Sequence, residues 1–245
     1  MLVLSVLALA AGSASCEPRT LTSANGSLVV TVDKKSVDTS KNIYLVRKNL
    51  DTTVRTSDSA GHQLGERKFF LTVDVATVAP QGRYFAVIDT GFDPFDGDSN
   101  PDVSGASPAD RKLDLSYHQV MILDRRGEIV WNKRITGRTN SPPRVIGFST
   151  GDKHLLYQTA HSEYGAVDVL KKSERVVNAP EKIIPTEILD DGTIRAFKKE
   201  SDERAWKKRP DGSRYLSGGK ITSRIYVLKP GESEFEATDE MHVVN

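Results

Sequence analysis

A short phrase recurs four times along this 245-residue chain: a tight polar turn followed at once by a run of strand-forming residues. The turns lie at 24–27, 80–83, 150–153 and 210–213, and the runs behind them cover 28–32, 84–88, 154–157 and 214–216. Each turn contains Gly together with Asn, Asp, Pro or Ser, the residues that build tight turns. Self-similarity of this kind is typical of repeat architectures. The sequence therefore predicts repeated β-units, although the phrase itself specifies no chemistry.

Strand signals continue between these turns. The predicted strands are short, rich in Val, Ile, Tyr and Phe, and bounded by turn residues. They cover 27–32, 42–47, 69–78, 84–89, 118–123, 128–135, 145–148, 154–159, 166–170, 186–189, 193–197 and 224–228. No segment has a sustained helical period. The nearest candidate, 198–208, has little apolar surface, so we expect an exposed turn or a short surface helix there.

Three hairpins can be placed from their turns. Gly127 lies between two apolar runs in 120–131, and it can supply the positive φ that a bulged turn needs. Asp191-Gly192, in 186–197, is a strong hairpin signal, and a third hairpin covers 225–235. Strands joined by such turns form antiparallel meanders.

The meanders group into four units, at 23–59, 68–137, 144–178 and 184–239. Their order of strands and turns resembles the blades of β-propeller proteins, in which a turn of the type Ser-Pro-Asp-Gly-Lys precedes the second strand. Pro80-Gln81-Gly82-Arg83-Tyr84-Phe85-Ala86 and Arg209-Pro210-Asp211-Gly212-Ser213-Arg214-Tyr215-Leu216 match this pattern best. The resemblance implies an all-β fold, a small or partial propeller of about four blade-like units. A β-sandwich made of the same meanders is the alternative.

The N-terminal segment has the pattern of an export signal. The uncharged apolar run 2–11 is too short to span a bilayer, and small residues follow it at 12–15. We therefore expect 1–15 to be a signal peptide and 16–245 to form a single all-β domain. Such a protein would be exported and would be periplasmic or anchored to the envelope.

Cys16 is the one cysteine of the chain, so no internal disulfide can form. Ser13-Ala14-Ser15-Cys16 resembles the lipobox of bacterial lipoproteins, which implies lipidation of Cys16. The family prefers Leu where this chain has Ser13, and the alternatives are ordinary cleavage at a small-x-small site and a buried or incidental cysteine. The predicted contact with a membrane is limited to this lipid anchor.

The longest irregular stretch, 90–116, is rich in acidic residues. Loops of this length inside a domain are usually functional or disordered. Oxygen-bearing side chains recur at Asp93, Asp96, Asp98, Asn100 and Asp102. Their spacing resembles the start of an EF-hand loop and suggests Ca²⁺, a cation that takes six to eight oxygen ligands. Pro101 and Ser107 depart from that pattern, and a solvated acidic insertion that requires no cofactor is the alternative.

Trp206 lies among charged residues, where an indole is difficult to bury. A tryptophan beside cations is typical of an interface, so Trp206, Arg204 and Lys207 are the predicted partner-binding residues. The alternative is an indole folded over the neighbouring unit. The formal net charge of +1 gives no electrostatic signature of nucleic-acid binding.

These features favour an exported, envelope-associated propeller-like protein that binds another macromolecule, most simply a protein, without catalysis of its own. An inhibitor or immunity-type lipoprotein belongs to that class by analogy. The alternative is a metal-assisted hydrolase of a glycan or of a phosphate or sulfate ester, with its site at 90–116 and its metal on Asp93, Asp96 and Asp98. A carbohydrate-binding module is a third possibility. No residue is assigned a catalytic role.

Overall fold

The computed structural model describes residues 18–34, 52–69, 73–89, 117–136, 143–159 and 162–244. Every regular element in this part of the chain is a β-strand, and all neighbouring strands pair antiparallel. Within the described ranges there is no helix long and apolar enough to cross a membrane. The predicted all-β fold is confirmed.

The strands form four sheets of four strands each, and in the first three sheets spatial order follows chain order. The first sheet contains β1 (Arg19–Thr22), β2 (Val29–Lys34), β3 (Thr52–Ser57) and β4 (Gln63–Phe69). The second contains β5 (Val73–Val78), β6 (Tyr84–Asp89), β7 (Tyr117–Asp124) and β8 (Ile129–Thr136). The third contains β9 (Arg144–Phe148), β10 (His154–Gln158), β11 (Glu163–Asp168) and β12 (Ser173–Asn178).

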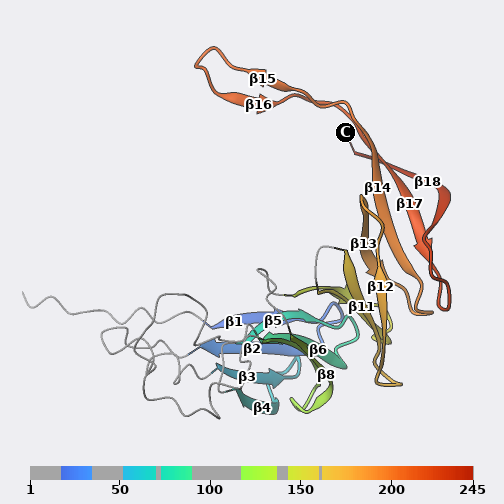
Figure 1. Cartoon of the computed structure of the whole chain (residues 1–245). Helices are drawn as coiled ribbons and strands as arrows, with labels where there is room; N and C mark the ends of the chain where they lie inside the picture. The colour runs from blue at the N-terminus through green and yellow to red at the C-terminus, as the bar shows by residue number, and fades with distance from the viewer. Residues whose placement is uncertain are drawn as a thin grey trace, which may run out of the picture.

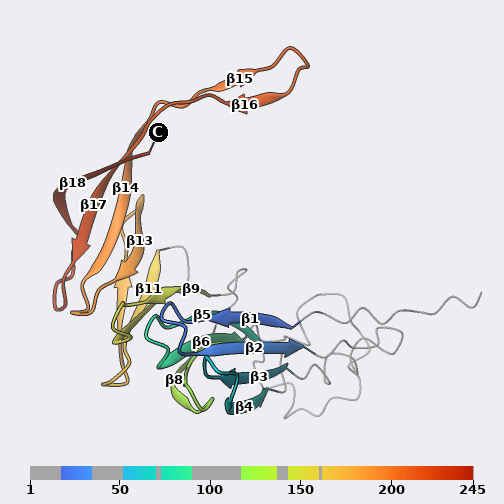
Figure 2. The same cartoon turned by 180° about the vertical axis from the view of Figure 1, so that it is seen from behind.

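The fourth sheet carries an insertion. Its order is β13-β14-β17-β18, and a separate two-stranded sheet, β15-β16, lies between β14 and β17 in the chain. The bounds are β13 (Ile183–Ile188), β14 (Ile194–Asp202), β15 (Trp206–Lys208), β16 (Arg214–Leu216), β17 (Ile221–Leu228) and β18 (Glu236–Val244). In Figures 1 and 2 the β15–β16 hairpin projects from the end of the β14–β17 pair that points away from the other sheets.

Apolar cores fill the spaces between successive sheets. In β2 the alternation of buried Val30 and Val32 with partly exposed Thr31 presents one apolar face, as a period of two requires. That face packs on Phe85 and Val87 of β6. A second core joins the second and third sheets, and a third joins the third and fourth. Burial of these side chains stabilises the fold by about 25 cal/mol per Å² of apolar surface.

The sheets are arranged as propeller blades. The first strands of neighbouring sheets, β1, β5, β9 and β13, approach one another in sequence order, and each sheet extends outward from its first strand. The first and fourth sheets lie at opposite ends of the resulting arc (Figures 1 and 2). The arrangement is a partial propeller of four blades, and the sandwich alternative is excluded because four sheets, not two, pack face to face.

One part of the predicted repeat is wrong. The turns at 24–27, 80–83 and 150–153 do precede the second strands of the first three blades, but the turn at 210–213 is the tip of the projecting hairpin. The corresponding turn of the fourth blade lies between β13 and β14, where Leu189 N donates to Thr193 O at 2.8 Å. The fourth blade therefore uses the Asp191-Gly192 hairpin as its repeat turn.

Other boundaries also differ from the prediction. Strands β1, β3, β12, β15 and β18 have no counterpart among the predicted strands, and the predicted strand at 69–78 covers β5 but only Phe69 of β4. The segment 198–208 is neither a helix nor an isolated turn, because β14 continues to Asp202 in pairing with β17 and β15 begins at Trp206. The strand predicted at 42–47 lies outside the described residues.

Candidate functional site

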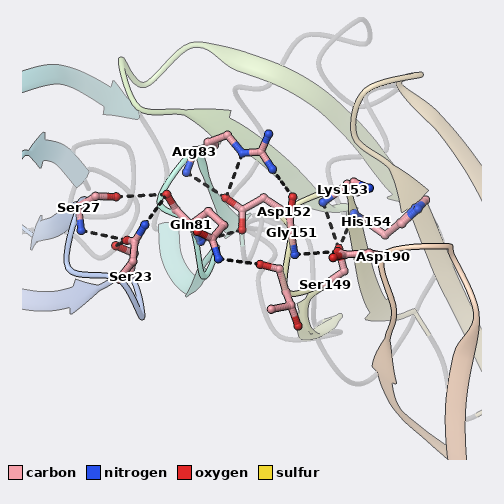
Figure 3. A network of polar contacts seen from close by, with 12 residues as sticks. Ser23, Ser27, Gln81, Arg83, Ser149, Gly151, Asp152, Lys153, His154 and Asp190 are labelled. Atoms are coloured by element: carbon pink, nitrogen blue, oxygen red, sulfur yellow. Dashed lines mark hydrogen bonds and ion pairs between the residues drawn. The ribbon is translucent and has the colours of Figure 1, made fainter.

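A series of hydrogen bonds joins the turns that precede the second strand of each blade (Figure 3). These turns, 23–28, 79–84, 149–154 and 189–193, are called the turn belt below. The first two turns meet at Gln81, whose backbone carbonyl accepts hydrogen bonds from Asn25 Nδ2 and Ser27 Oγ, each at 3.1 Å. The backbone N–H of Asn25 also donates to Pro80 O at 3.2 Å. The belt therefore begins as a direct link from the first blade to the second.

Asp152 joins the second and third blades. Its carboxylate accepts hydrogen bonds from the backbone N–H of Gln81 at 2.9 Å and of Arg83 at 3.1 Å. Arg83 Nε lies 3.6 Å from the same carboxylate, and the Asp152 side chain is fully buried. A buried carboxylate with two backbone donors and a guanidinium has the partners that its charge requires. Asp152 thus links the second and third blades through a buried carboxylate.

Asp190 joins the third and fourth blades. Its Oδ1 accepts a hydrogen bond from the backbone N–H of Gly151 at 2.7 Å. A hydrogen bond from the Ser149 hydroxyl and the bond from Gly151 lower the pKa of Asp190 below its usual value. The carboxylates of the belt are thus held by backbone and hydroxyl donors, so the belt positions the blades and its carboxylates are already engaged.

The projecting hairpin, residues 203–220, has the opposite character. Trp206 on β15 is 69% exposed, the highest value among the exposed large hydrophobic side chains of the described residues. Tyr215 and Leu216 on β16 are each 38% exposed. Large apolar side chains gathered on one exposed element indicate an interaction surface more strongly than scattered ones do. The predicted alternative, an indole folded over a neighbouring blade, is not what the structure has.

The base of the hairpin is held by polar contacts. Ser217 N donates to Ala205 O at 2.7 Å, and Ala205 N donates to Ser217 Oγ at 2.9 Å. Glu203 N donates to Lys220 O at 2.9 Å. These bonds continue the ladder of β14 and β17, so the hairpin extends from the fourth blade as an ordered ribbon.

Asp202 forms ion pairs with two cations at the base of the hairpin. Arg204 Nε donates to Asp202 Oδ1 at 2.9 Å, and Lys199 Nζ donates to Oδ2. The hydrogen bond from Arg204 and then that from Lys199 lower the pKa of Asp202 well below its usual range. Arg204 is therefore part of the anchor of the hairpin, while its predicted role in partner binding stays a prediction.

The two faces of the hairpin follow from its register. Trp206 pairs with Leu216 and Lys208 pairs with Arg214, so these four side chains share one face. Lys207 pairs with Tyr215 on the other face, where the guanidinium carbon of Arg209 lies 5.2 Å from the centre of the Tyr215 ring. Each face thus combines an aromatic ring with cations. Of the predicted partner-binding residues, Trp206 and Lys207 lie side by side on β15 and point to opposite faces.

Sequence reasoning did not include Lys208, Arg214, Tyr215 and Leu216 in this site. The alternation of Trp206-Lys207-Lys208 and of Arg214-Tyr215-Leu216, with a Pro-Asp-Gly-Ser turn between them, is the signal that could have identified a two-faced hairpin.

The predicted metal and lipid sites lie elsewhere in the chain. Asp93, Asp96, Asp98, Asn100 and Asp102 are outside the described residues, and so is Cys16. Among the residues that the structure does describe, no group of three or more His, Cys, Asp or Glu side chains is arranged to hold a metal ion. The calcium loop and the lipid anchor stay predictions.

Comparison with known proteins reveals no similarity at the level of sequence families. No protein-family model matches the sequence. No curated protein matches it significantly.

Several solved structures align with this chain at low similarity. A HIRA fragment aligns with a TM-score of 0.49 and 11% identity over 95% of this chain, which spans 57% of that HIRA chain. The propeller domain of the Trilobed protease from Pyrococcus furiosus, described as having an open velcro topology, aligns with a TM-score of 0.41 and 11% identity, covering 90% of this chain and 69% of its own. BamB from Moraxella catarrhalis aligns with a TM-score of 0.24 and 13% identity, over 93% and 76% of the two chains. At such values the description as a partial propeller depends on the strand pairing and packing given above.

Proposed function

We propose that this protein is an exported, envelope-associated binding protein that recognises another protein through the projecting hairpin, without chemistry of its own. One observation carries the proposal: Trp206 is 69% exposed on a ribbon that is anchored at its base and directed away from the blades. Exposing an indole to water is unfavourable unless a partner covers it, and tryptophan is enriched among the residues that dominate binding energy.

The different roles of the turn belt and the projecting hairpin support this function. The turn belt fixes the four blades relative to one another, and the hairpin extends from the last of them. Binding residues placed on an ordered element lose less conformational entropy when a partner binds. A partner that is an enzyme or toxin masked by this contact would make the protein an inhibitor or immunity protein.

The test is capture of the full-length protein from its native host after chemical cross-linking in intact cells. Wild type is compared with Trp206→Ala and with Leu170→Ala, a matched control because Leu170 is a comparably exposed apolar residue, at 64%, in the turn between β11 and β12. We expect one protein partner that is retained by Leu170→Ala and reduced at least about tenfold by Trp206→Ala, as for a hot-spot residue. A partner retained equally by both variants would exclude the hairpin as the binding element.

Export is tested separately. Wild type and Cys16→Ala are fractionated, and lipid attachment is followed by metabolic labelling with a fatty acid. Labelled wild type in the membrane fraction and unlabelled Cys16→Ala would support the anchor. Wild type found only in the cytosol would overturn the export part of the proposal and leave the binding part standing.

A further inference from the structure

The charges of the hairpin are divided between its base and its tip. At the base, Arg204 and Lys199 are both paired with Asp202. Elsewhere in the fourth blade, Arg195 is paired with Glu187 and Glu240, at 3.0 and 2.7 Å. In this blade Arg195, Lys199, Arg204, Arg224 and Lys229 thus have carboxylate partners.

The tip differs. Among the described residues, the charged groups of Lys207, Lys208 and Arg214 have no ion pair and no hydrogen bond. Arg209 makes a cation–π contact with Tyr215 and no ion pair with a described residue. The single carboxylate between β15 and β16, Asp211, turns inward and accepts hydrogen bonds from Ser213 N at 2.8 Å and from Ser213 Oγ at 2.7 Å. The tip is therefore a local concentration of unneutralised positive charge in a chain whose formal net charge is only +1.

These cations occupy both faces of the ribbon, as do the exposed rings. Trp206, Leu216, Lys208 and Arg214 lie on one face, whereas Lys207 and Tyr215 lie on the other. A flat surface would cover one face and leave the second aromatic ring in water. A cleft would cover both faces at once, with apolar contacts to the rings and carboxylates opposite the cations.

We infer that the hairpin inserts into an acidic cleft of its protein partner, so that both faces of the ribbon are covered. This inference rests on the proposed function and specifies the chemistry of the partner's site. The rings supply the apolar contact area, and the unpaired cations at the tip provide electrostatic attraction and orientation.

The test places a photo-cross-linking amino acid, p-benzoylphenylalanine, in the full-length protein in its native host. Position 216 reports on the Trp206 face, position 215 reports on the opposite face, and position 68 on β4 is the control because Lys68 is exposed and far from the hairpin in the fold. We expect positions 215 and 216 to cross-link to the same protein, through peptides rich in Asp and Glu, and position 68 not to cross-link to it. Cross-links from one face alone, or to nucleic acid or lipid from either face, would overturn the inference.

Charge reversal gives an independent readout. Lys207→Glu/Lys208→Glu is compared with Lys68→Glu/Arg126→Glu, which changes the net charge equally at exposed positions of the first two blades. We expect the hairpin variant to lower the yield of cross-links at least about tenfold and the control variant to leave it within about twofold, since like charges placed opposite a partner's carboxylates repel one another. Equal yields would overturn the acidic cleft, while the proposed function would still stand if Trp206→Ala abolished capture.

Discussion

The turns at 150–153 and 210–213 look alike in sequence and have opposite roles in the structure. Each turn is closed by a backbone hydrogen bond to the carbonyl oxygen three positions earlier. Asp152 N donates to Ser149 O in the first turn and Gly212 N donates to Arg209 O in the second, each at 3.0 Å. The first lies in the turn belt, where Asp152 is buried and holds backbone groups of another blade. The second lies at the tip of the hairpin, where the side chain of Asp211 bonds only within its own turn as far as the described residues are concerned. Turn chemistry thus fixes local geometry, whereas the surroundings decide whether a turn joins blades or remains exposed.

The largest expected difference is between these two aspartates. Asp152→Ala removes the acceptor of two backbone N–H groups, so we expect the free energy of unfolding to fall by about 3 kcal/mol. Asp211→Ala breaks bonds within an exposed turn, and we expect a loss of about 0.5 kcal/mol. Urea denaturation of each purified protein at constant m-value measures both changes.

Asp152→Asn is the control that keeps the size and shape of the side chain and removes its charge. Asn tolerates the positive φ of 56° that Asp152 adopts, and its one carbonyl oxygen preserves part of the bonding. We expect an intermediate loss of stability. Equal losses for Asp152→Ala and Asp211→Ala would show that the turn belt does not hold the blades together.

Two glycines at the same turn position extend the comparison between the turn belt and the hairpin. Gly82 in the turn belt and Gly212 in the hairpin both have positive φ, 67° and 87°. A Cβ at Gly82 would lie 2.4 Å from Ser27 Oγ of the neighbouring blade, whereas a Cβ at Gly212 would have nothing within 4 Å. We expect Gly82→Ala to cost about 2 kcal/mol from backbone strain and crowding together, and Gly212→Ala to cost about 1 kcal/mol from strain alone.

The measurement is again the urea midpoint of each variant. If Gly212→Ala were the more destabilising change, crowding between the blades would not be the cause. Binding by Gly212→Ala would report in addition whether the shape of the tip matters to the partner.

The smallest expected effect depends on pH and concerns Asp190. Its pKa is lowered in the folded state by the hydroxyl of Ser149 and the amide of Gly151. Its stabilising contribution is therefore complete above the ordinary carboxyl pKa of about 3.9 and is lost as the pH falls through the lower folded-state pKa. We expect the protection factor of the Gly151 amide in hydrogen exchange to decrease below about pH 4.

Asp190→Asn provides the control for this titration. Its carbonyl oxygen can still accept the Gly151 bond and it does not titrate, so the decrease in protection should be absent. The same pH dependence in the variant would assign the effect to another group.

The sequence predicted much of the fold because its signals are local. The hairpin turn at Asp124–Glu128 lies where Gly127 predicted it, and the structure contains four antiparallel meanders as expected. Strands β4 and β12 were missed because they are largely polar in sequence and lie at the outer edges of their sheets, where one face or edge remains in water. Period and hydrophobicity carry little signal at such positions.

The candidate site was predicted in part. Trp206 among cations was a readable signal, but the segment around it was expected to be a turn or a short helix. Its true form depends on the pairing of Lys198–Asp202 with Ile221–Arg224, residues about twenty positions apart, which continues β14 and β17 into the hairpin. No local pattern in 198–208 specifies that pairing.

By itself, the sequence determined the short strands, the tight turns that join them and the exposure of the charged segment around Trp206, because these depend on local backbone preference and on the cost of burying charge. Tertiary structure decided which of the similar turns join blades, which one became the tip of a ribbon, and which cations have carboxylate partners. Those outcomes depend on hydrogen bonds and ion pairs between residues distant in the chain, such as Asp152 with Gln81 between two blades and Arg195 with Glu240 within one sheet, and such contacts exist only after the strands have paired and the blades have packed.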